Sequence, residues 1–258
     1  MNSSPAANAF QLRCRFHGDL RFFLGSRLAQ APVLEKLLRE KTSVKDVIES
    51  CGVPHTEVDL ILVNGDPVNF SHQLMTHGEI DIFPVSAPRE LFPVHRLQQR
   101  RLTRFIADGH LGKLVRDLRL LGIDVCYDKD AADAQLLITA TTEGRALLTR
   151  DRRLLMHGIV RHGYCPRSHL HEEQTLEVIE RFALAEAIAP YTRCLRCNGI
   201  LARVEKSEVL DQLEPLTRIY YEDFRRCTEC RRIYWPGSHF EKLQARIELL
   251  LGRQNAVQ

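Results

Sequence analysis

The sequence predicts an α/β protein with a parallel sheet at its centre, a smaller α+β unit before that sheet and a cysteine-based metal module after it. From residue 104 onward, strand-like and helix-like segments alternate, and repeated βαβ units form parallel sheets covered by helices. Short alternating strands fill residues 10–86, and two Cys-x-x-Cys pairs lie near the end of the chain. We therefore expect four parts: residues 10–86, a linker over 87–103, a core over 104–189 and a metal module over 190–245.

The first unit contains strand signals around one short helix. The segment "QLRCRF" (11–16) alternates in polarity, a turn is expected at 17–20, and "RFFL" (21–24) is expected to resume the strand. Residues 43–52 predict a helix capped by Ser43 and ended by Gly52. Residues 59–68 predict a hairpin turning at Asn64-Gly65, and 79–85 predict the last strand. The segment "VLEKLLRE" (33–40) fits a helix and a strand equally.

The segment 87–103 has the composition of a linker. It carries two prolines and, together with Arg104, five arginines. A solvated connector and a strip that faces phosphate groups are both compatible with this composition.

The core is expected to alternate regularly. Strands are predicted at 104–108, 123–128, 145–151 and 159–164, and helices at 110–122, 131–144, 152–158 and 172–189. The first three strands end on Asp108, Asp128 and Asp151. Because ligands of open parallel sheets bind outside the carboxyl ends of the strands, we expect these acids to converge.

Clustered carboxylates repel one another unless a divalent cation neutralises them, and oxygen-only clusters suit Mg²⁺ or Mn²⁺. Such an ion activates water and stabilises a leaving phosphate oxygen. Asp is also a favoured helix N-cap, so each acid has a purely structural explanation as well. The basic residues expected to hold a phosphodiester or its developing charge are Lys113, Arg150, Arg152 and Arg153.

The cysteine module has the spacing C-x2-C…x29…C-x2-C, in which two knuckles supply four thiolates to a tetrahedral Zn²⁺. The predicted ligands are Cys194, Cys197, Cys227 and Cys230. With all four positions filled by protein, the zinc is expected to be structural. The pair Tyr234-Trp235 and several arginines flank the ligands, and these side chains suit either RNA contacts or the packing of a small core. The four other cysteines are expected to be small core residues.

Three stretches together resemble the MUT-seven C-terminal RNase family: "RFIADGHLGKLVRDLRLLGIDVCYD", "GRALLTRDRRLL" and "CLRCNG…CTECRRIYWPGSHFEKL". The resemblance covers about 104–245. It implies a nuclease core similar to PIN domains, an appended zinc ribbon, and an Mg²⁺- or Mn²⁺-dependent ribonuclease that cleaves RNA phosphodiesters.

The same resemblance implies roles for individual acids. Asp108 matches the acid that ends the first strand, and Asp151 the acid of the "TRDR" turn; these two are the predicted Mg²⁺ or Mn²⁺ ligands. Asp130 and Asp133 are both candidates for a middle catalytic acid. Gly109 directly follows the first acid, so the loop there is expected to be unusually free. A non-catalytic RNA-binding or scaffold protein of the same fold is the main alternative, and a nuclease acting on DNA is another.

Residues 10–86 resemble the ubiquitin-like β-grasp module often fused to this RNase family, and similar to small sulfur carriers. Those carriers work through a free Gly-Gly tail, whereas here the last strand runs into "SAPRELFPVH". A docking or regulatory role, with a possible protein partner, is therefore expected in place of sulfur transfer. Because the unit has a hydrophobic pattern of its own, we expect the rest of the chain to fold without it.

Composition adds few constraints. The net charge is +3; residues 1–86 carry 8 basic against 10 acidic side chains, and residues 87–258 carry 28 against 23. That bias is too weak to indicate a nucleic-acid binder by itself. The first residues lack the pattern of a signal peptide, and no apolar run approaches the ~20 residues of a membrane helix, so a cytoplasmic location without membrane contact is expected.

Overall fold

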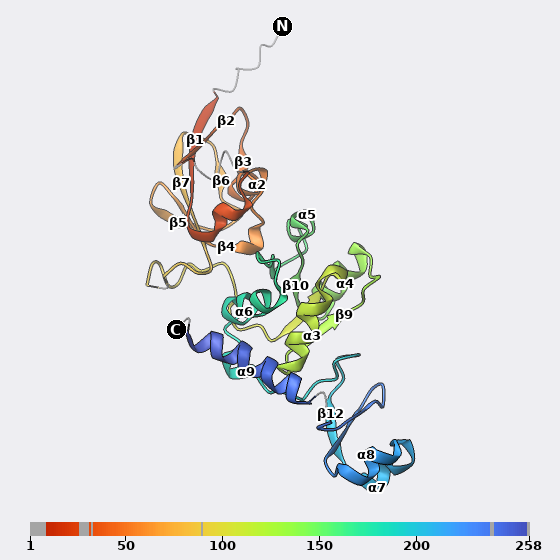
Figure 1. Cartoon of the computed structure of the whole chain (residues 1–258). Helices are drawn as coiled ribbons and strands as arrows, with labels where there is room; N and C mark the ends of the chain where they lie inside the picture. Colours follow the sequence, from red (N-terminus) through yellow and green to blue (C-terminus); the bar gives the residue numbers. More distant parts are fainter. Residues whose placement is uncertain (1–8, 26–30, 32, 89, 238–239, 257–258) are drawn as a thin grey trace. The chain divides into compact units, whose positions relative to one another are not determined.

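A computed structural model describes residues 9–25, 31, 33–88, 90–237 and 240–256. The first eight residues and Arg89 of the predicted linker lie outside the described residues. The chain divides into two compact units (Figure 1). Unit 1 comprises Met1–Arg100 with Thr149–Cys165, and unit 2 comprises Arg101–Leu148 with Pro166–Gln258. The contacts thus group one segment of the predicted core, 149–165, with the N-terminal unit.

Unit 1 is built on a five-stranded mixed sheet in the order β2-β1-β7-β4-β5. Strands β1 and β7 are parallel, and the other neighbours are antiparallel. Its elements are β1 (Phe10–Phe16), η1 (Gly18–Phe23), β2 (Leu34–Leu38), β3 (Thr42–Ser43), α2 (Val44–Ser50), η2 (His55–Glu57), β4 (Val58–Val63), β5 (Asp66–Val68), β6 (Gln73–Leu74), β7 (Gly78–Pro84), α5 (Arg152–Leu155) and β11 (Gly163–Tyr164).

Two local predictions for unit 1 are confirmed. The Ser43 side chain caps α2 by accepting a hydrogen bond from the Asp46 N–H. Strands β4 and β5 form the expected hairpin, with Asn64 at φ 52° and Gly65 at φ 90°. Both residues tolerate this left-handed backbone, which the two-residue turn requires.

The strand expected over 21–24 is wrong, and the ambiguity over 33–40 is resolved. Gly18–Phe23 form a 3₁₀ helix in which Leu20 and Phe23 are buried, three residues apart. That spacing follows a helical period, whereas a strand alternates every second residue. Leu34–Leu38 form strand β2, which pairs antiparallel with β1.

The C-terminal part of the predicted linker is held by a buried carboxylate. Asp59 is fully buried in β4, and its oxygens accept from the Gln98 N–H at 2.8 Å and from Arg96 at 3.1 Å. The Gln98 side-chain amide donates in turn to the carbonyls of His55 and Val58. Residues 96–98 are therefore packed on unit 1.

The segment 149–165 is anchored in unit 1 by three long-range contacts. The buried Glu57 carboxylate accepts from the Cys165 N–H at 2.7 Å. The His55 ring is hydrogen-bonded to the Val160 carbonyl at 2.7 Å. The third contact joins Arg152 to the Phe23 carbonyl, also at 2.7 Å. The predicted strand 159–164 is reduced to Gly163–Tyr164.

Unit 2 contains the parallel strands β10-β8-β9 and the cysteine module. Strand β8 pairs in parallel with β10 on one side and with β9 on the other. Its elements are β8 (Arg104–Ala107), η3 (Gly109–Leu111), α3 (Gly112–Leu120), β9 (Asp124–Tyr127), α4 (Asp133–Thr142), β10 (Ala146–Leu148), α6 (His171–Arg181), η4 (Ala185–Ala187), β12 (Leu201–Val204), α7 (Lys206–Val209), η5 (Leu210–Gln212), α8 (Pro215–Tyr220), β13 (Phe224–Cys227), β14 (Ile233–Tyr234) and α9 (Phe240–Ala256).

The helix expected over 172–189 is shorter than predicted. Helix α6 ends at Arg181, Ala183 takes φ 50°, and only a 3₁₀ turn follows at Ala185–Ala187. Phe182, just past the helix end, is fully buried and packs edge-on against Phe105 of β8, with ring centroids 4.9 Å apart. Burial of this aromatic ring fixes where the chain leaves the helix.

Helix α9, which the sequence interpretation did not include, is joined to α3 and α6 through a buried charge. Asp117 of α3 accepts from Arg246 of α9 at 2.6 Å and contacts the His171 ring at 2.8 Å. Arg246 also donates to Glu172 at 2.7 Å. One arginine thus connects the last helix to two others.

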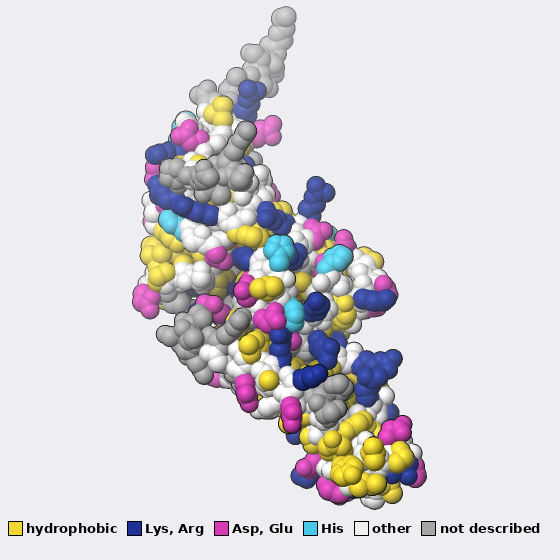
Figure 2. Space-filling view, in the orientation of Figure 1, with side chains coloured by type: hydrophobic (Ala, Val, Ile, Leu, Met, Phe, Trp, Pro, Cys, Tyr) yellow, Lys and Arg dark blue, Asp and Glu magenta, His cyan; other side chains and the backbone are white. Residues whose placement is uncertain are grey.

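The cysteine module forms the antiparallel sheet β12-β13-β14. Beside it, α8 exposes Leu216, Ile219 and Tyr220. Figure 2 shows hydrophobic side chains gathered over the region of α7 and α8. The α/β fold class is confirmed, including the N-terminal sheet unit, the parallel strands and the cluster of four cysteines.

Candidate functional site

Two neighbouring parallel strands of unit 2 end on acids. Ala107 of β8 lies opposite Tyr127 of β9, and the next residues are Asp108 and Asp128. Asp108 is half-buried, whereas Asp128 and Asp130 are exposed. The two strand-ending acids therefore begin neighbouring loops at the same edge of the sheet. Convergence of their carboxylates on one ion stays a prediction.

The two loops pack closely through backbone and glycine. A Cβ atom on Gly109 would collide with the Lys129 carbonyl oxygen, and one on Gly112 would lie 2.7 Å from the Tyr127 hydroxyl. The Tyr127 hydroxyl donates to the Gly109 carbonyl at 2.8 Å. Gly109 therefore allows the two loops to approach each other closely. The expectation of an unusually free loop is wrong.

The electrostatics of Tyr127 show how the acids surround it. Burial raises the pKa of its hydroxyl, Arg119 opposes this, and the charges of Asp108, Asp130 and Asp128 raise it further. All three carboxylates act electrostatically on this phenol, but among the described residues they do not form a group of potential metal ligands as the four cysteines do. The sequence interpretation missed Tyr127, although its position directly before a strand-ending acid was a usable signal.

The remaining predicted residues of unit 2 lie around these loops. Asp130 is next to Asp128, whose carboxylate accepts from the Asp130 N–H at 3.0 Å. Asp133 begins α4, Lys113 is the second residue of α3, and both are exposed. The choice between Asp130 and Asp133 as the middle acid stays a prediction.

Asp151 belongs to unit 1 and caps a helix. Its Oδ1 accepts from the N–H groups of Arg153 at 2.7 Å and Leu154 at 3.3 Å, at the start of α5. Asp151 therefore has the helix N-cap role that was the structural explanation for this acid. Both hydrogen bonds end on Oδ1, so Oδ2 takes no part in capping. The pairing of Asp151 with Asp108 stays a prediction.

The three arginines around Asp151 are not equivalent. Arg152 donates to the carbonyl oxygens of Phe23 at 2.7 Å and Phe22 at 3.4 Å, and its guanidinium lies over both rings. These contacts give Arg152 a structural task in unit 1. Arg150 and Arg153 are exposed to solvent, and their expected contact with a substrate stays a prediction.

The four predicted zinc ligands lie together. The Sγ atoms of Cys194, Cys197, Cys227 and Cys230 are all within 4.8 Å of one another, and they form the only group of three or more potential metal ligands among the described residues. Although burial opposes ionisation, hydrogen bonds from Tyr234 and from backbone N–H groups lower the pKa of Cys194 to about 6. Burial raises the pKa of Cys227 to about 12. Four sulfurs at this spacing match a tetrahedral zinc site.

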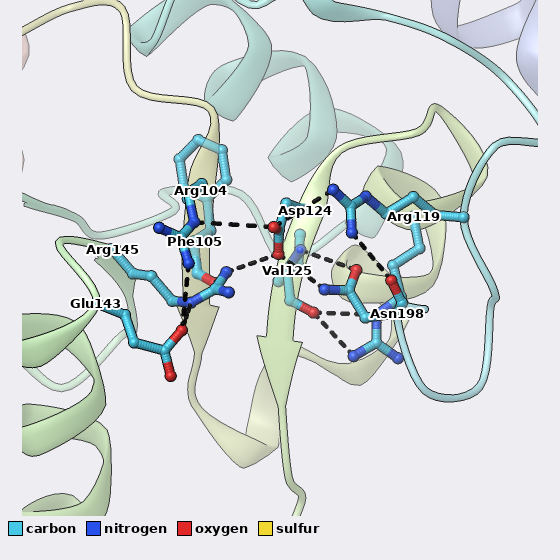
Figure 3. Close-up of polar contacts among 9 residues, drawn as sticks. Arg104, Phe105, Arg119, Asp124, Val125, Glu143, Arg145 and Asn198 are labelled. Carbon is cyan, nitrogen blue, oxygen red and sulfur yellow. Dashed lines mark hydrogen bonds and ion pairs between the residues drawn. The ribbon is translucent and has the colours of Figure 1, made fainter. Parts of the chain in front are cut away.

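A polar network joins the cysteine module to the parallel sheet (Figure 3). Asn198, which follows the ligand Cys197, accepts from the Val125 N–H at 3.1 Å and donates to Asp124 at 2.8 Å. Arg145 also donates to the Asp124 carboxylate, at 2.6 Å. Although burial opposes its charge, hydrogen bonds from Arg145 and Asn198 lower the pKa of Asp124.

Arg119 provides a second connection. It donates to the Val125 carbonyl at 2.8 Å and to the carbonyls of Leu195 and Arg196 at 3.3 and 2.9 Å. The first cysteine knuckle is thereby fixed on β9, the strand that leads into the acid loop. Sequence reasoning missed this network because its members are far apart in the chain.

Comparison with protein families identifies both regions. The model of the Mut7-C RNAse domain matches residues 103–247, more than half of the chain. The chain belongs to the Mut7-C RNAse domain family. The model of the Mut7-C ubiquitin domain matches residues 9–90, so the predicted resemblance is confirmed in both regions. The Mut7-C assignment indicates a nuclease-like role.

A comparison with curated proteins found no match. Within the part of the chain that the structure describes, no helix is both long and apolar enough to cross a membrane.

Proposed function

We propose that this Mut7-C protein is a metal-dependent ribonuclease whose reaction takes place at the acid loops that follow β8 and β9. The observation that carries the proposal is the close packing of the loop that follows Asp108 against the loop that follows Tyr127, through Gly109, Lys129 and the Tyr127 hydroxyl. Carboxylate oxygens are the kind of donor that Mg²⁺ and Mn²⁺ prefer. Asp108, Asp151 and one of Asp130 or Asp133 would hold the ion, which supplies a water of lowered pKa and neutralises a phosphate oxygen.

The protein's own groups position these acids. Tyr127 bonds the Gly109 carbonyl and so fixes the backbone that carries Asp108. Lys113, in the first turn of α3, offers a cation and a helix N-terminus to a phosphate. Asp151 is included because it matches the acid of the "TRDR" turn in the family that the chain resembles.

The test is cleavage of a labelled RNA pool with and without Mg²⁺ or Mn²⁺. Asp108→Asn should lower the rate at least about 100-fold, because metal ligands and their supports carry effects of this size or more. Asp66→Asn, an exposed acid on β5, serves as the matched control and should cleave normally.

Asp151→Asn isolates the ligand role of Asp151, since Asn caps a helix as well as Asp does. An unchanged melting temperature with lost cleavage is expected. Comparison of Asp130→Asn with Asp133→Asn identifies the middle acid. RNA binding without cleavage by the wild-type protein would favour the non-catalytic alternative, and a matched DNA pool tests the DNA alternative.

The cluster of four cysteines is proposed to hold a structural zinc. Purified protein should contain one zinc per chain, and Cys197→Ser should lower solubility and thermal stability, because binding energy at such sites is folding energy. Folded, soluble protein without zinc would contradict this. For the ubiquitin-like unit we propose binding to a protein partner.

A further inference from the structure

A hollow of about 910 Å³ lies on unit 2 among the three strands of the cysteine module and the start of α9. Among the described residues its lining contains one carboxylate, Asp223, which is already paired with Arg203 at 2.9 Å. Five basic side chains line it: Arg116, Arg203, Arg225, Arg232 and Lys242. The excess of positive charge suits a polyanion.

Three of these cations are available to a ligand. Within the described part of the chain, Arg116, Arg232 and Lys242 form no ion pair with a carboxylate, and all three are exposed. Arg225, by contrast, is bonded to the Tyr191 carbonyl at 2.7 Å. These three positive charges are therefore not neutralised by a carboxylate of the described residues.

Aromatic rings complete the lining. Trp235 is 40% exposed, and its ring edge lies against Gly237, where a Cβ would come within 2.7 Å of the indole nitrogen. Phe224 holds the other side of the indole, with ring centroids 6.5 Å apart. An indole that is held by these neighbours and is 40% exposed offers a stacking surface for an unpaired base.

A second hollow, of about 450 Å³, adjoins the first. The two share Arg116, Arg232 and Tyr234 in their linings. The lining of the second hollow also includes Gly112 and Tyr127, the residues packed beside the acid loops. None of the described residues that line this second hollow is acidic. A basic path therefore leads from Trp235 to the proposed reaction site.

We propose that these two hollows form one binding groove for single-stranded RNA, with bases stacked on Trp235 and phosphates held by Arg116 and Arg232. The groove would direct the strand toward Asp108. Paired bases are already stacked inside a duplex and cannot use the indole, so the groove should select unpaired strands. This inference rests on the proposed ribonuclease function.

Trp235 is the single tryptophan of the chain, so its fluorescence reports on the groove alone. Titration of the full-length protein with a short oligoribonucleotide, without added divalent cation, should quench this fluorescence. A duplex of the same sequence should bind at least about tenfold more weakly, the ratio that corresponds to loss of one stacked base.

Arg232→Gln and Arg116→Gln should each weaken single-strand binding by about tenfold, because each removes a charge-assisted contact to phosphate. Arg231→Gln is the matched control, since the neighbouring Arg231 is also exposed but lines neither hollow. Trp235→Phe should keep the zinc and the fold while weakening binding of labelled RNA, measured by anisotropy.

Equal affinity for duplex and single strand would overturn the proposal, as would equal effects of Arg231→Gln and Arg232→Gln. Quenching of the same size by poly-glutamate would assign the groove to an acidic peptide instead. Binding is measured apart from cleavage, so loss of the proposed function leaves a different signature: normal quenching with no metal-dependent cleavage. A DNA oligonucleotide that binds more tightly than RNA would also contradict the assignment to RNA.

Discussion

Replacement of Asn198 by alanine should weaken the attachment of the cysteine module to the parallel sheet, with Arg119 still in place. The change removes the acceptor of the buried Val125 N–H, which costs about 1–3 kcal/mol of stability. It also removes the hydrogen bond that Asn198 donates to the Asp124 carboxylate. Asp124 retains Arg145 and Arg193, so the second loss falls at the low end of the range for charged partners. Together we expect a destabilisation of about 3 kcal/mol from these two losses.

Asn198 also has φ 71°, a left-handed backbone that costs alanine about 1–2 kcal/mol and glycine nothing. Asn198→Gly loses the same two hydrogen bonds but avoids this strain. After allowance for the flexibility of glycine in the unfolded chain, it should be about 0.5–1 kcal/mol more stable than Asn198→Ala. This order reverses the usual ranking of the two residues.

Urea unfolding followed by circular dichroism measures the global effect, and amide hydrogen exchange at Val125 measures the local one. A loss of about 3 kcal/mol corresponds to a roughly 100-fold drop in protection of that amide. Asn69→Ala is the matched control, because the Asn69 side chain also forms two hydrogen bonds, both as acceptor, but is exposed. A change under about 0.5 kcal/mol for Asn198→Ala, or an alanine variant as stable as the glycine variant, would refute this reasoning.

Three further changes test other parts of the molecule. Gly109→Ala should reduce cleavage sharply while the melting temperature falls little, because the added methyl pushes the Asp108 loop away from the 128–130 loop; normal cleavage would contradict this. Glu57→Ala should expose the Cys165 amide to hydrogen exchange, since that buried N–H loses its acceptor at a cost of about 1–3 kcal/mol, whereas an unchanged rate would count against the anchor. The hydrogen bond from Arg246 lowers the pKa of Glu172 from 4.5 to about 2. The pair therefore stabilises α9 above pH ~4.5, and this contribution is lost as the pH falls toward 2. Arg246→Gln should make the free energy of unfolding less dependent on pH over this range, measured by unfolding at several pH values.

Much of the fold and the metal module could be predicted from local patterns. The helix capped by Ser43, the hairpin at Asn64-Gly65 and the four cysteines each carry a signal within a few residues. The strands β8 and β9 and their terminal acids followed from alternation and from the geometry of parallel sheets.

What the sequence could not provide depends on contacts between distant residues. Local pattern read 21–24 as a strand because two phenylalanines and a leucine have high strand propensity, but burial of Leu20 and Phe23 favoured a 3₁₀ turn. The role of Gly109 became visible only through the carbonyl of Lys129, which lies in a different loop. The grouping of 149–165 with unit 1 rests on side chains such as Glu57, for which the sequence gives no local cue.

The anchoring of residues 149–165 in unit 1 bears on how the chain is made. The bond between His55 and Val160 spans 105 residues, and the one between Arg152 and Phe23 spans 129. Domains usually fold one after another as they emerge during synthesis. Here the ubiquitin-like domain cannot acquire its last buried partners until residue 165 has left the ribosome, so its completion waits for more than half of the nascent chain.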